Sequence, residues 1–306
     1  MQGLVIKSTG SWYQVETENG KIIDCRIKGK FRTKDIKTTN PVAVGDEVEI
    51  ELEPELSTGV ITKLKDRKNY IIRKSVNLSK QAQIIAANLD QAFLIVTLAS
   101  PRTSLGFIDR FLVTAEAYDI PASIIFNKLD LFSDEGLEIL ADYRDIYERL
   151  GYPCYQVSAK DGTNLEEIKD LLKDKTTLVT GHSGVGKSTL INQLIPDVEL
   201  KTGEISEWSD KGQHTTTFAE MHKLPQGGYL IDTPGIRELG IIDIEKQELS
   251  HFFPEMRELL NQCKYHNCRH INEPGCAVLA ALEEGEIDES RYDSYLSIYH
   301  GNDTRS

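Results

Sequence analysis

The stretch Gly181-His182-Ser183-Gly184-Val185-Gly186-Lys187-Ser188 matches the phosphate-binding pattern G-x-x-x-x-G-K-[ST] at every fixed position. In this pattern glycines let backbone N–H groups turn toward phosphate oxygens, the lysine reaches the outer phosphates, and the last hydroxyl binds Mg²⁺. The apolar run 176–180 predicts a buried strand before the loop, and residues 187–194 predict a helix after it. This context argues against a glycine-rich loop that matches by chance. We expect a nucleotide site that also includes the next residue, Thr189.

Four further motifs complete a set typical of guanine-nucleotide-binding domains, but their order is unusual. Asn127-Lys128-Leu129-Asp130 and Ser158-Ala159-Lys160 precede the phosphate loop, whereas Thr215-Thr216-Thr217 and Asp232-Thr233-Pro234-Gly235 follow it. An ordinary small GTPase begins with the phosphate loop and ends with the NKxD and SAK motifs. The order therefore predicts a central α/β P-loop GTPase domain that is circularly permuted.

The NKxD motif predicts which base is bound. It follows the apolar run 121–126, which predicts a strand, and ligands of open parallel sheets bind at the carboxyl ends of the strands. The carboxylate of Asp130 only accepts hydrogen bonds, which suits the two donors on the N1 and N2 edge of guanine and disfavours adenine. We expect Asn127 to brace the loop and contact the base, and the stem of Lys128 to lie along the base.

The SAK motif, Ser158, Ala159 and Lys160, follows a second strand-like run at 152–157. In GTPases the backbone N–H of the alanine meets the guanine O6 atom. Three residues alone carry little information, and the alternative for the NKxD motif is a surface loop that begins with an Asn-Lys turn. The spacing of the two motifs, with one helix-length stretch between them, favours the base-binding interpretation.

The motifs after the phosphate loop predict the Mg²⁺ site and the hydrolytic step. Ser188, Thr216 and Asp232 are the expected Mg²⁺ ligands, although any residue of 215–217 can supply the threonine, and the N–H of Gly235 would sense the γ-phosphate. Ile236 stands where Ras-like enzymes place the glutamine that orients water, so slow intrinsic hydrolysis is expected. Our candidate catalytic residues are Lys187, Thr216 and His214. For His214, an uninvolved solvated loop histidine is an equal alternative.

Length and composition favour a multidomain protein of the cytoplasm. The chain has 306 residues, 40% of them hydrophobic, with no apolar stretch long enough to cross a membrane and no signal peptide at its start. Five cysteines over this length do not form a disulfide framework. The net charge of −13 argues against non-specific coating of nucleic acid.

The first 68 residues predict a small OB-type β-barrel. Alternating strand patterns at 12–17 and 21–27 flank Glu18-Asn19-Gly20, a strong hairpin signal, and further strands are expected at 47–52 and 59–64. Residues 1–74 hold 14 Lys and Arg against 11 Asp and Glu. The excess gathers at Arg26, Lys28, Lys30, Arg32, Lys34 and Lys37. A solvated surface is the usual explanation of such a run, and nucleic-acid contact is the second one.

The last part of the chain, 242–306, predicts a mainly helical zinc-binding domain. Cys263, Cys268, His270 and Cys276 are the expected ligands of a structural tetrahedral Zn²⁺ site, with His266 as the competing histidine. Buried or free thiols beside a histidine are the alternative. Two helical segments should follow, one before Gly285 and one at 290–299 whose tyrosines pack in the core. The GTPase domain then spans 69–241.

An OB-like start, a permuted GTPase and a Cys-Cys-His-Cys cluster together resemble the ribosome small-subunit-dependent GTPase A (RsgA/YjeQ) family over essentially the whole chain. The most specific strings are 181–188, 213–217, 232–235 and 268–276. The resemblance implies slow GTP hydrolysis that the small ribosomal subunit stimulates, a role late in maturation of that subunit, and contact with its rRNA. It implies GTP or GDP, Mg²⁺ and one structural Zn²⁺ as ligands. We expect a monomer that can meet other assembly factors but no membrane.

Two other functions also fit parts of the sequence. A metabolic P-loop kinase or ATPase would leave the NKxD motif idle and would bind ATP as well as GTP. A non-hydrolysing RNA-binding scaffold would use the nucleotide domain only as a sensor. Because the DxxG segment runs through Ile236-Arg237-Glu238-Leu239 toward the zinc domain, nucleotide-dependent movement of that domain is expected, and a passive linker is the alternative.

Overall fold

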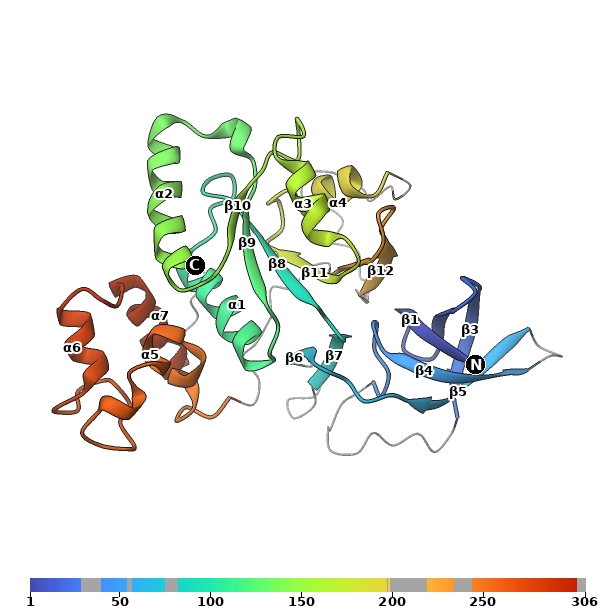
Figure 1. The fold of residues 1–306 in the computed structure, drawn as a ribbon, viewed down its shortest axis with the longest axis horizontal. Helices are drawn as coiled ribbons and strands as arrows, with labels where there is room; N and C mark the ends of the chain where they lie inside the picture. The colour runs from blue at the N-terminus through green and yellow to red at the C-terminus, as the bar shows by residue number, and fades with distance from the viewer. Residues whose placement is uncertain are drawn as a thin grey trace, which may run out of the picture.

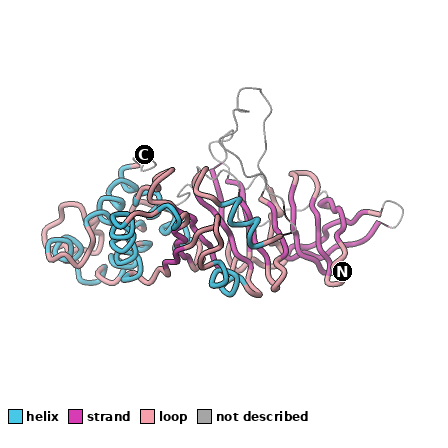
Figure 2. Tube along the Cα trace, turned by 90° about the horizontal axis from the view of Figure 1, so that it is seen from above, coloured by secondary structure: helices cyan, strands magenta, loops and turns pink. Residues whose placement is uncertain are grey.

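The computed structural model describes residues 1–28, 40–53, 57–74, 82–196, 198, 219–233 and 244–301, which form an elongated molecule (Figure 1). A strand barrel lies at the N-terminal end, an α/β layer in the middle and a helical part at the other end. Seen from above, the helices of the C-terminal part gather at one end, and strands run through the rest (Figure 2). No helix in the described ranges is long and apolar enough to span a membrane.

The N-terminal barrel closes as an OB-type barrel does. Its strands pair in the order β1-β2-β3-β5-β4, β3 and β5 are parallel, and β4 returns to pair with β1. Alternating inward residues such as Val5, Val15 and Ile61 fill the interior, and Gly20 has the positive φ of +74° that the predicted hairpin turn requires. The OB-type prediction is confirmed. The strands are β1 (Gln2–Ser8), β2 (Tyr13–Thr17), β3 (Ile22–Ile27), β4 (Glu47–Glu53) and β5 (Thr58–Leu64).

A two-stranded ribbon, β6 (Tyr70–Lys74) and β7 (Ala82–Ala87), follows the barrel and was not expected from the sequence. The barrel segment 40–46 lies along β7, where Val44 and Ala86 form a parallel bridge. The Asn40 side chain bonds both the N–H and the carbonyl of Ile84, at 3.1 and 2.9 Å. A Cβ atom at Gly45 would lie 2.1 Å from the carbonyl oxygen of Ala87, so only glycine permits this close approach.

The central sheet has the strand order β10-β9-β8-β11-β13-β12. Only its edge strand β12 is antiparallel to its neighbour within this set. Helices α1 and α2 cover one face and α3 and α4 the other, each through its own buried apolar cluster. The strands are β8 (Gln91–Val96), β9 (Ala122–Phe126), β10 (Cys154–Gln156), β11 (Thr176–Gly181), β12 (Glu220–Lys223) and β13 (Tyr229–Asp232). The helices are α1 (Leu105–Ala117), η1 (Leu129–Leu131), α2 (Asp134–Arg149), α3 (Leu165–Leu172) and α4 (Lys187–Leu194).

This sheet order places the predicted motifs together. The NKxD, SAK, phosphate-loop and DxxG motifs begin at or just after the ends of β9, β10, β11 and β13. These four strands run parallel to one another, so their carboxyl ends meet at one edge of the sheet. The motifs therefore begin at one edge of the sheet although their order in the chain is permuted.

The barrel joins the central sheet through β12. Strand β1 pairs antiparallel with β12 at Lys7 and Glu220, which also form an ion pair of 2.5 Å between Nζ and Oε1. Next to this pair, the carboxylate of Glu16 accepts hydrogen bonds from Lys223 Nζ (2.6 Å) and from the hydroxyl of Tyr229 (2.8 Å). Barrel and central sheet thus share backbone and side-chain contacts.

The C-terminal part packs around a buried cluster that includes Phe253, Cys276, Tyr292 and Tyr295. The predicted tyrosine stripe therefore lies in the core, and Gly285, with φ +75°, follows the end of α6. Helix α7 packs against α1 of the central layer. The elements are η3 (Leu249–Phe252), α5 (Pro254–Arg257), η4 (Leu260–Gln262), α6 (Ala277–Glu283) and α7 (Glu289–His300).

Candidate nucleotide site and metal centre

Asn127 joins the motifs of the candidate nucleotide site. Its side chain is 1% exposed. Nδ2 donates to the carbonyl of Val185 in the phosphate loop (2.8 Å), and Oδ1 accepts from the N–H of Ala159 in the SAK motif (3.0 Å). The bracing role predicted for this residue therefore has a geometric basis, since one amide fixes two loops that come from different strands.

Asp130 is held by the SAK motif. The hydroxyl of Ser158 donates to its Oδ1 atom (2.8 Å), and Lys160 Nζ lies 3.7 Å from Oδ2. A carboxylate oriented in this way still has free lone pairs for a pair of donors such as the N1 and N2 edge of guanine. Lys128 has a left-handed backbone (φ +67°), and its Nζ donates to the carbonyl of Ser100 (2.5 Å).

The phosphate loop depends on glycine where other motifs approach it. Gly186 has φ +91°, and a Cβ atom there would lie 2.4 Å from Asn127 Nδ2. Val185 is fully buried and packs in the cluster below α4, which anchors the loop from inside. Ser188 and Thr189 lie in the first turn of α4, where the helix N-terminus favours anions.

Lys187 and Asp232 meet at the centre of the site. Their Nζ and Oδ1 atoms are 2.5 Å apart, and the side chains are 11% and 10% exposed. The sequence predicts that Lys187 binds the outer phosphates and that Asp232 holds Mg²⁺, and the structure brings these two groups together from α4 and β13. The carboxylate of Asp232 and the hydroxyl of Ser188 are groups that suit Mg²⁺, and the ammonium of Lys187 suits phosphate oxygens.

Several predicted residues lie outside the described ranges. They are His214, Thr215, Thr216, Thr217, Pro234, Gly235 and Ile236, together with most of the basic run around Arg32. Their roles in hydrolysis, Mg²⁺ binding and γ-phosphate sensing stay predictions.

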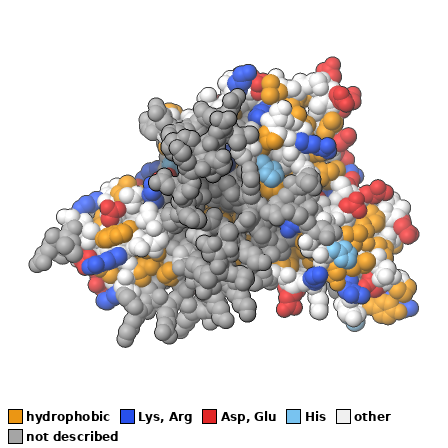
Figure 3. All heavy atoms as spheres, turned by 180° about the vertical axis from the view of Figure 1, so that it is seen from behind, with side chains coloured by type: hydrophobic (Ala, Val, Ile, Leu, Met, Phe, Trp, Pro, Cys, Tyr) orange, Lys and Arg blue, Asp and Glu red, His pale blue; other side chains and the backbone are white. Residues whose placement is uncertain are grey.

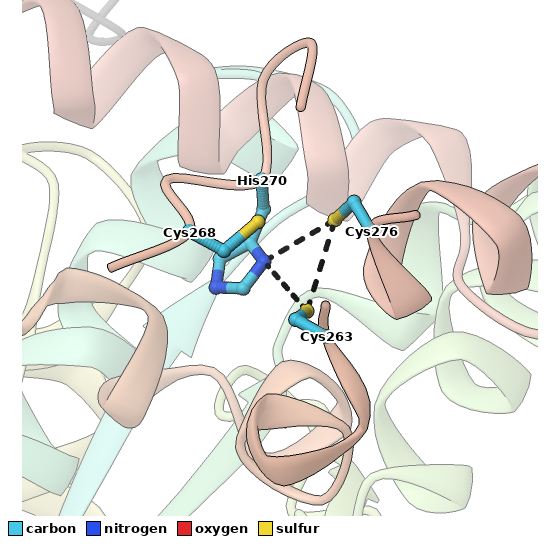
Figure 4. Close-up of side chains that lie close together, drawn as sticks. All are labelled: Cys263, Cys268, His270 and Cys276. Atoms are coloured by element: carbon cyan, nitrogen blue, oxygen red, sulfur yellow. Dashed lines mark hydrogen bonds between the residues drawn. The ribbon is translucent and has the colours of Figure 1, made fainter. Parts of the chain in front are cut away.

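The predicted zinc ligands converge in one cluster (Figure 4). The ligand atoms of Cys263, Cys268, His270 and Cys276 all lie within 4.8 Å of one another. His270 Nδ1 is 3.6 Å from Cys263 Sγ and 3.4 Å from Cys276 Sγ, and the two sulfurs are 4.0 Å apart. Zn–S and Zn–N bonds at tetrahedral angles give S···S and S···N separations of about 3.8 and 3.6 Å, so the cluster fits zinc.

The different burial of the two histidines and the hydrogen bonds of the loop that carries the ligands both support this metal cluster. His266 is exposed and outside it, whereas His270 is buried, and burial lowers the pKa of its imidazole and so favours the neutral form that binds metals. The hydroxyl of Tyr292 donates to the His270 carbonyl at 2.7 Å.

Burial opposes ionisation of Glu273, but backbone N–H groups, among them those of Arg269 and Ile271, outweigh it and lower the pKa of Glu273 to about 2. Its carboxylate thereby shapes the ligand loop.

Charge on the surface is mixed. On the face shown in Figure 3, the coloured Lys and Arg side chains are scattered among acidic, apolar and neutral ones. Two cations of the predicted basic segment are described, and both are exposed. Arg26 is ion-paired with Glu53 at 2.7 Å, whereas Lys28 lies at the end of the described barrel strand.

Sequence reasoning missed a segment beside the phosphate loop. Residues 100–107 contact Lys128, Gly184 and His182, although they carry no nucleotide-binding motif. Another missed feature is the buried ion pair between Asp109 of α1 and Arg291 of α7, at 2.7 Å. Neither has a local signal, because each depends on residues that are distant in the chain.

The sheet order and the meeting of the NKxD, SAK, phosphate-loop and DxxG motifs define a circularly permuted GTPase, an enzyme that hydrolyses GTP. The family model described as RsgA GTPase matches residues 64–242, and the model described as RsgA N-terminal domain matches 2–61. The chain belongs to the RsgA GTPase family.

Named relatives and solved structures agree with this assignment. The small ribosomal subunit biogenesis GTPase RsgA of Bacteroides fragilis strain YCH46 is 56% identical over 298 residues, which cover 97% of this chain and 96% of that protein. The protein of the same name from Christiangramia forsetii is 57% identical, and the match covers 98% of this chain and 96% of that protein. The crystal structure of YjeQ from Thermotoga maritima matches with a TM-score of 0.80 at 38% identity, over 98% and 97% of the two chains. YloQ, described as a circularly permuted GTPase, matches with a TM-score of 0.74 at 32% identity over 98% and 94%.

Proposed function

We propose that this GTPase assists or checks late maturation of the small ribosomal subunit, and that docking on that subunit through rRNA stimulates its slow GTP hydrolysis. The observation that carries the nucleotide part is the bonding of Asn127 to both Ala159 and Val185, which assembles the permuted motifs. The ribosomal part is supported by relatives above 50% identity that are named small ribosomal subunit biogenesis GTPases. We also propose a cytoplasmic monomer.

The proposed division of labour follows the three predicted parts, 1–68, 69–241 and 242–306. In the first part the barrel would dock on rRNA, since OB-type barrels commonly bind oligonucleotides on their strands and loops. The central part would bind guanine through Asp130 and the phosphates through the phosphate loop and Lys187. The last part would be held by one structural Zn²⁺ on Cys263, Cys268, His270 and Cys276.

The proposed hydrolytic step uses positioning and charge. Lys187 would bind the outer phosphate oxygens, and Asp232, Ser188 and Thr216 would hold Mg²⁺, which neutralises charge on those oxygens. Ile236 has no group that can orient water. The free protein would therefore hydrolyse GTP slowly, and His214 is our candidate for the group that the subunit brings into place.

Single-turnover GTP hydrolysis tests this proposal. We expect a slow basal rate, strong stimulation by saturating small subunits, and none by large subunits or with ATP. His214→Ala should keep GTP affinity and the basal rate but lose about 10²–10⁴-fold of the stimulated rate. An unchanged rate with small subunits would overturn the ribosomal role. Full stimulation of His214→Ala would assign water positioning to another group, and equal use of ATP would favour a general P-loop ATPase or kinase.

A further inference from the structure

We propose that residues 100–107 are an additional positioning element of the nucleotide site. In this element Phe107 holds the phosphate loop in place. Helix α1 carries Phe107 and packs against the zinc domain, so that contacts with the zinc domain also stabilise the phosphate loop. The proposal rests on the nucleotide site described above but not on any ribosomal role. It makes Phe107 and Asp109 functional residues although neither belongs to a GTPase motif.

Three contacts from this one short segment reach the nucleotide motifs. The Ser100 carbonyl accepts a hydrogen bond from the NKxD lysine, Lys128. The Pro101 ring would lie 3.3 Å from a Cβ atom built at Gly184, so it lies close to the phosphate loop. The Phe107 ring stacks on the His182 imidazole with centroids 3.7 Å apart and planes 31° apart.

Hydrogen bonds between Thr97, Pro101 and Thr103 fix the conformation of the start of this segment. Thr97, directly after β8, is fully buried, and Thr103 is 1% exposed. Thr103 N donates to the Thr97 carbonyl (2.8 Å), Thr97 N donates to Thr103 Oγ1 (3.2 Å), and Thr97 Oγ1 donates to the Pro101 carbonyl (2.5 Å). These three hydrogen bonds hold the segment in one conformation, so it can position the side chains that pack against it.

Helix α1 continues from this segment to the zinc domain. Two residues after Phe107, Asp109 is 0% exposed and bonds Arg291 of α7. Its other oxygen, Oδ2, accepts from Ser294 Oγ (2.5 Å), whereas the hydroxyl of Tyr147 of α2 donates at 2.9 Å to Oδ1, the oxygen that Arg291 also bonds. Because successive helical residues are turned by about 100°, Phe107 and Asp109 lie on nearly opposite sides of α1. One helix therefore contacts the phosphate loop on one side and the zinc domain on the other.

This arrangement predicts a specific effect on nucleotide binding. The backbone N–H groups around Gly184 can bind phosphate only when the phosphate loop keeps its conformation. The contact of the Phe107 ring with His182 restrains the start of that loop. Removal of the ring should speed nucleotide release by about 5–10-fold, the factor expected for one close aromatic contact.

The test measures dissociation of a fluorescent GDP analogue from the full-length protein. Phe107→Ala should release it at least fivefold faster, whereas Phe107→Tyr, which keeps the ring, should stay within twofold of wild type. Phe111→Ala is the matched control, because Phe111 is buried on the same helix and leaves the same kind of cavity without the stack on His182. Unchanged release from folded Phe107→Ala, or an equal effect of Phe111→Ala, would overturn the positioning role.

A second pair of variants tests the link to the zinc domain. Ser294→Ala removes one hydrogen bond to Asp109 without leaving a charge unpaired, and zinc content confirms that the domain is intact. We expect about two- to threefold faster release in the wild-type background and no additional effect in Phe107→Ala, because both changes act through α1. Wild-type release from Ser294→Ala, or effects that multiply in the double variant, would overturn the link. Both tests use the free protein, so loss of ribosomal stimulation would refute the proposed function without touching this inference.

Discussion

Asn127 and Val185 lie 58 positions apart, and the side-chain amide of the first donates to the backbone carbonyl of the second at 2.8 Å. In the chain the NKxD motif precedes the phosphate loop, yet in space this bond joins them. The fold thus brings together motifs that are far apart and permuted in the chain.

Asn127→Ala should therefore weaken GTP and GDP to a similar extent. The change leaves the buried Val185 carbonyl and Ala159 N–H without partners, which costs about 1–3 kcal/mol. Calorimetric titration measures both affinities. Asn69→Ala is the matched control, because that side chain also bonds backbone atoms, those of Leu89, but outside the site. Equal affinities for wild type and Asn127→Ala would show that the bond has no role in binding.

The zinc cluster predicts about one Zn²⁺ per chain in the purified protein. Cys268→Ser, Cys276→Ser and His270→Ala should lose the metal and destabilise the C-terminal part, while His266→Ala should retain it. Metal content by mass spectrometry, together with GTP binding as the folding control, checks this. Metal-free wild-type protein of equal stability would contradict a structural site, and zinc loss in His266→Ala alone would identify the other histidine as the ligand.

The ion pair between Asp109 and Arg291 predicts a large stability effect. Both side chains are about 1% exposed or less, and Arg291 also bonds Glu255 at 2.8 Å. Arg291→Met should destabilise the protein by about 3–5 kcal/mol, because two buried carboxylates lose their partner. Arg149→Ala breaks an exposed pair with Asp145 and should change the unfolding free energy by less than about 0.5 kcal/mol. Urea unfolding followed by fluorescence compares the two, and similar small effects would refute the assignment.

Glu16 predicts a pH-dependent contact between barrel and central sheet. Burial opposes its ionisation, but hydrogen bonds from Lys223 and Tyr229 outweigh burial and lower the pKa of Glu16. A carboxylate whose pKa is lower in the folded state stabilises the protein above its unfolded pKa, about 4.3 for glutamate, and loses that contribution as the pH falls through the folded value.

The difference in unfolding free energy between wild type and Glu16→Gln should thus be constant from about pH 7 to 5.5 and shrink below about pH 4.5. Urea titrations at several pH values measure it, with Glu51→Gln on the exposed side of β4 as the control for loss of one acidic group. A difference that grows as the pH falls would contradict this account.

Local sequence signals predicted the motifs and the elements that carry them. Asn19-Gly20 specifies a hairpin, and the apolar run before Gly181 specifies a buried strand, because both depend on neighbouring residues. The cysteine spacing and His270 likewise identify the metal cluster within fourteen positions.

Features that depend on long-range packing were not predicted. Asp109 occupies an ordinary helical position in the sequence, and only the fold shows that Arg291, 182 positions later, neutralises it. The pairing of β1 with β12 through Lys7 and Glu220 also has no local signal, since any exposed strand edge could accept the barrel. The same holds for the stack of Phe107 on His182.

The central claim, that the permuted motifs form one guanine-specific site, is tested most directly by the affinities of wild type and Asp130→Asn for GTP and xanthosine triphosphate. Wild type should strongly prefer GTP. Asp130→Asn should lose about 2–4 kcal/mol of GTP binding and gain affinity for the xanthine nucleotide, whose O2 accepts from the new amide. Unchanged GTP affinity in the variant, with no gain for xanthosine triphosphate, would contradict the account.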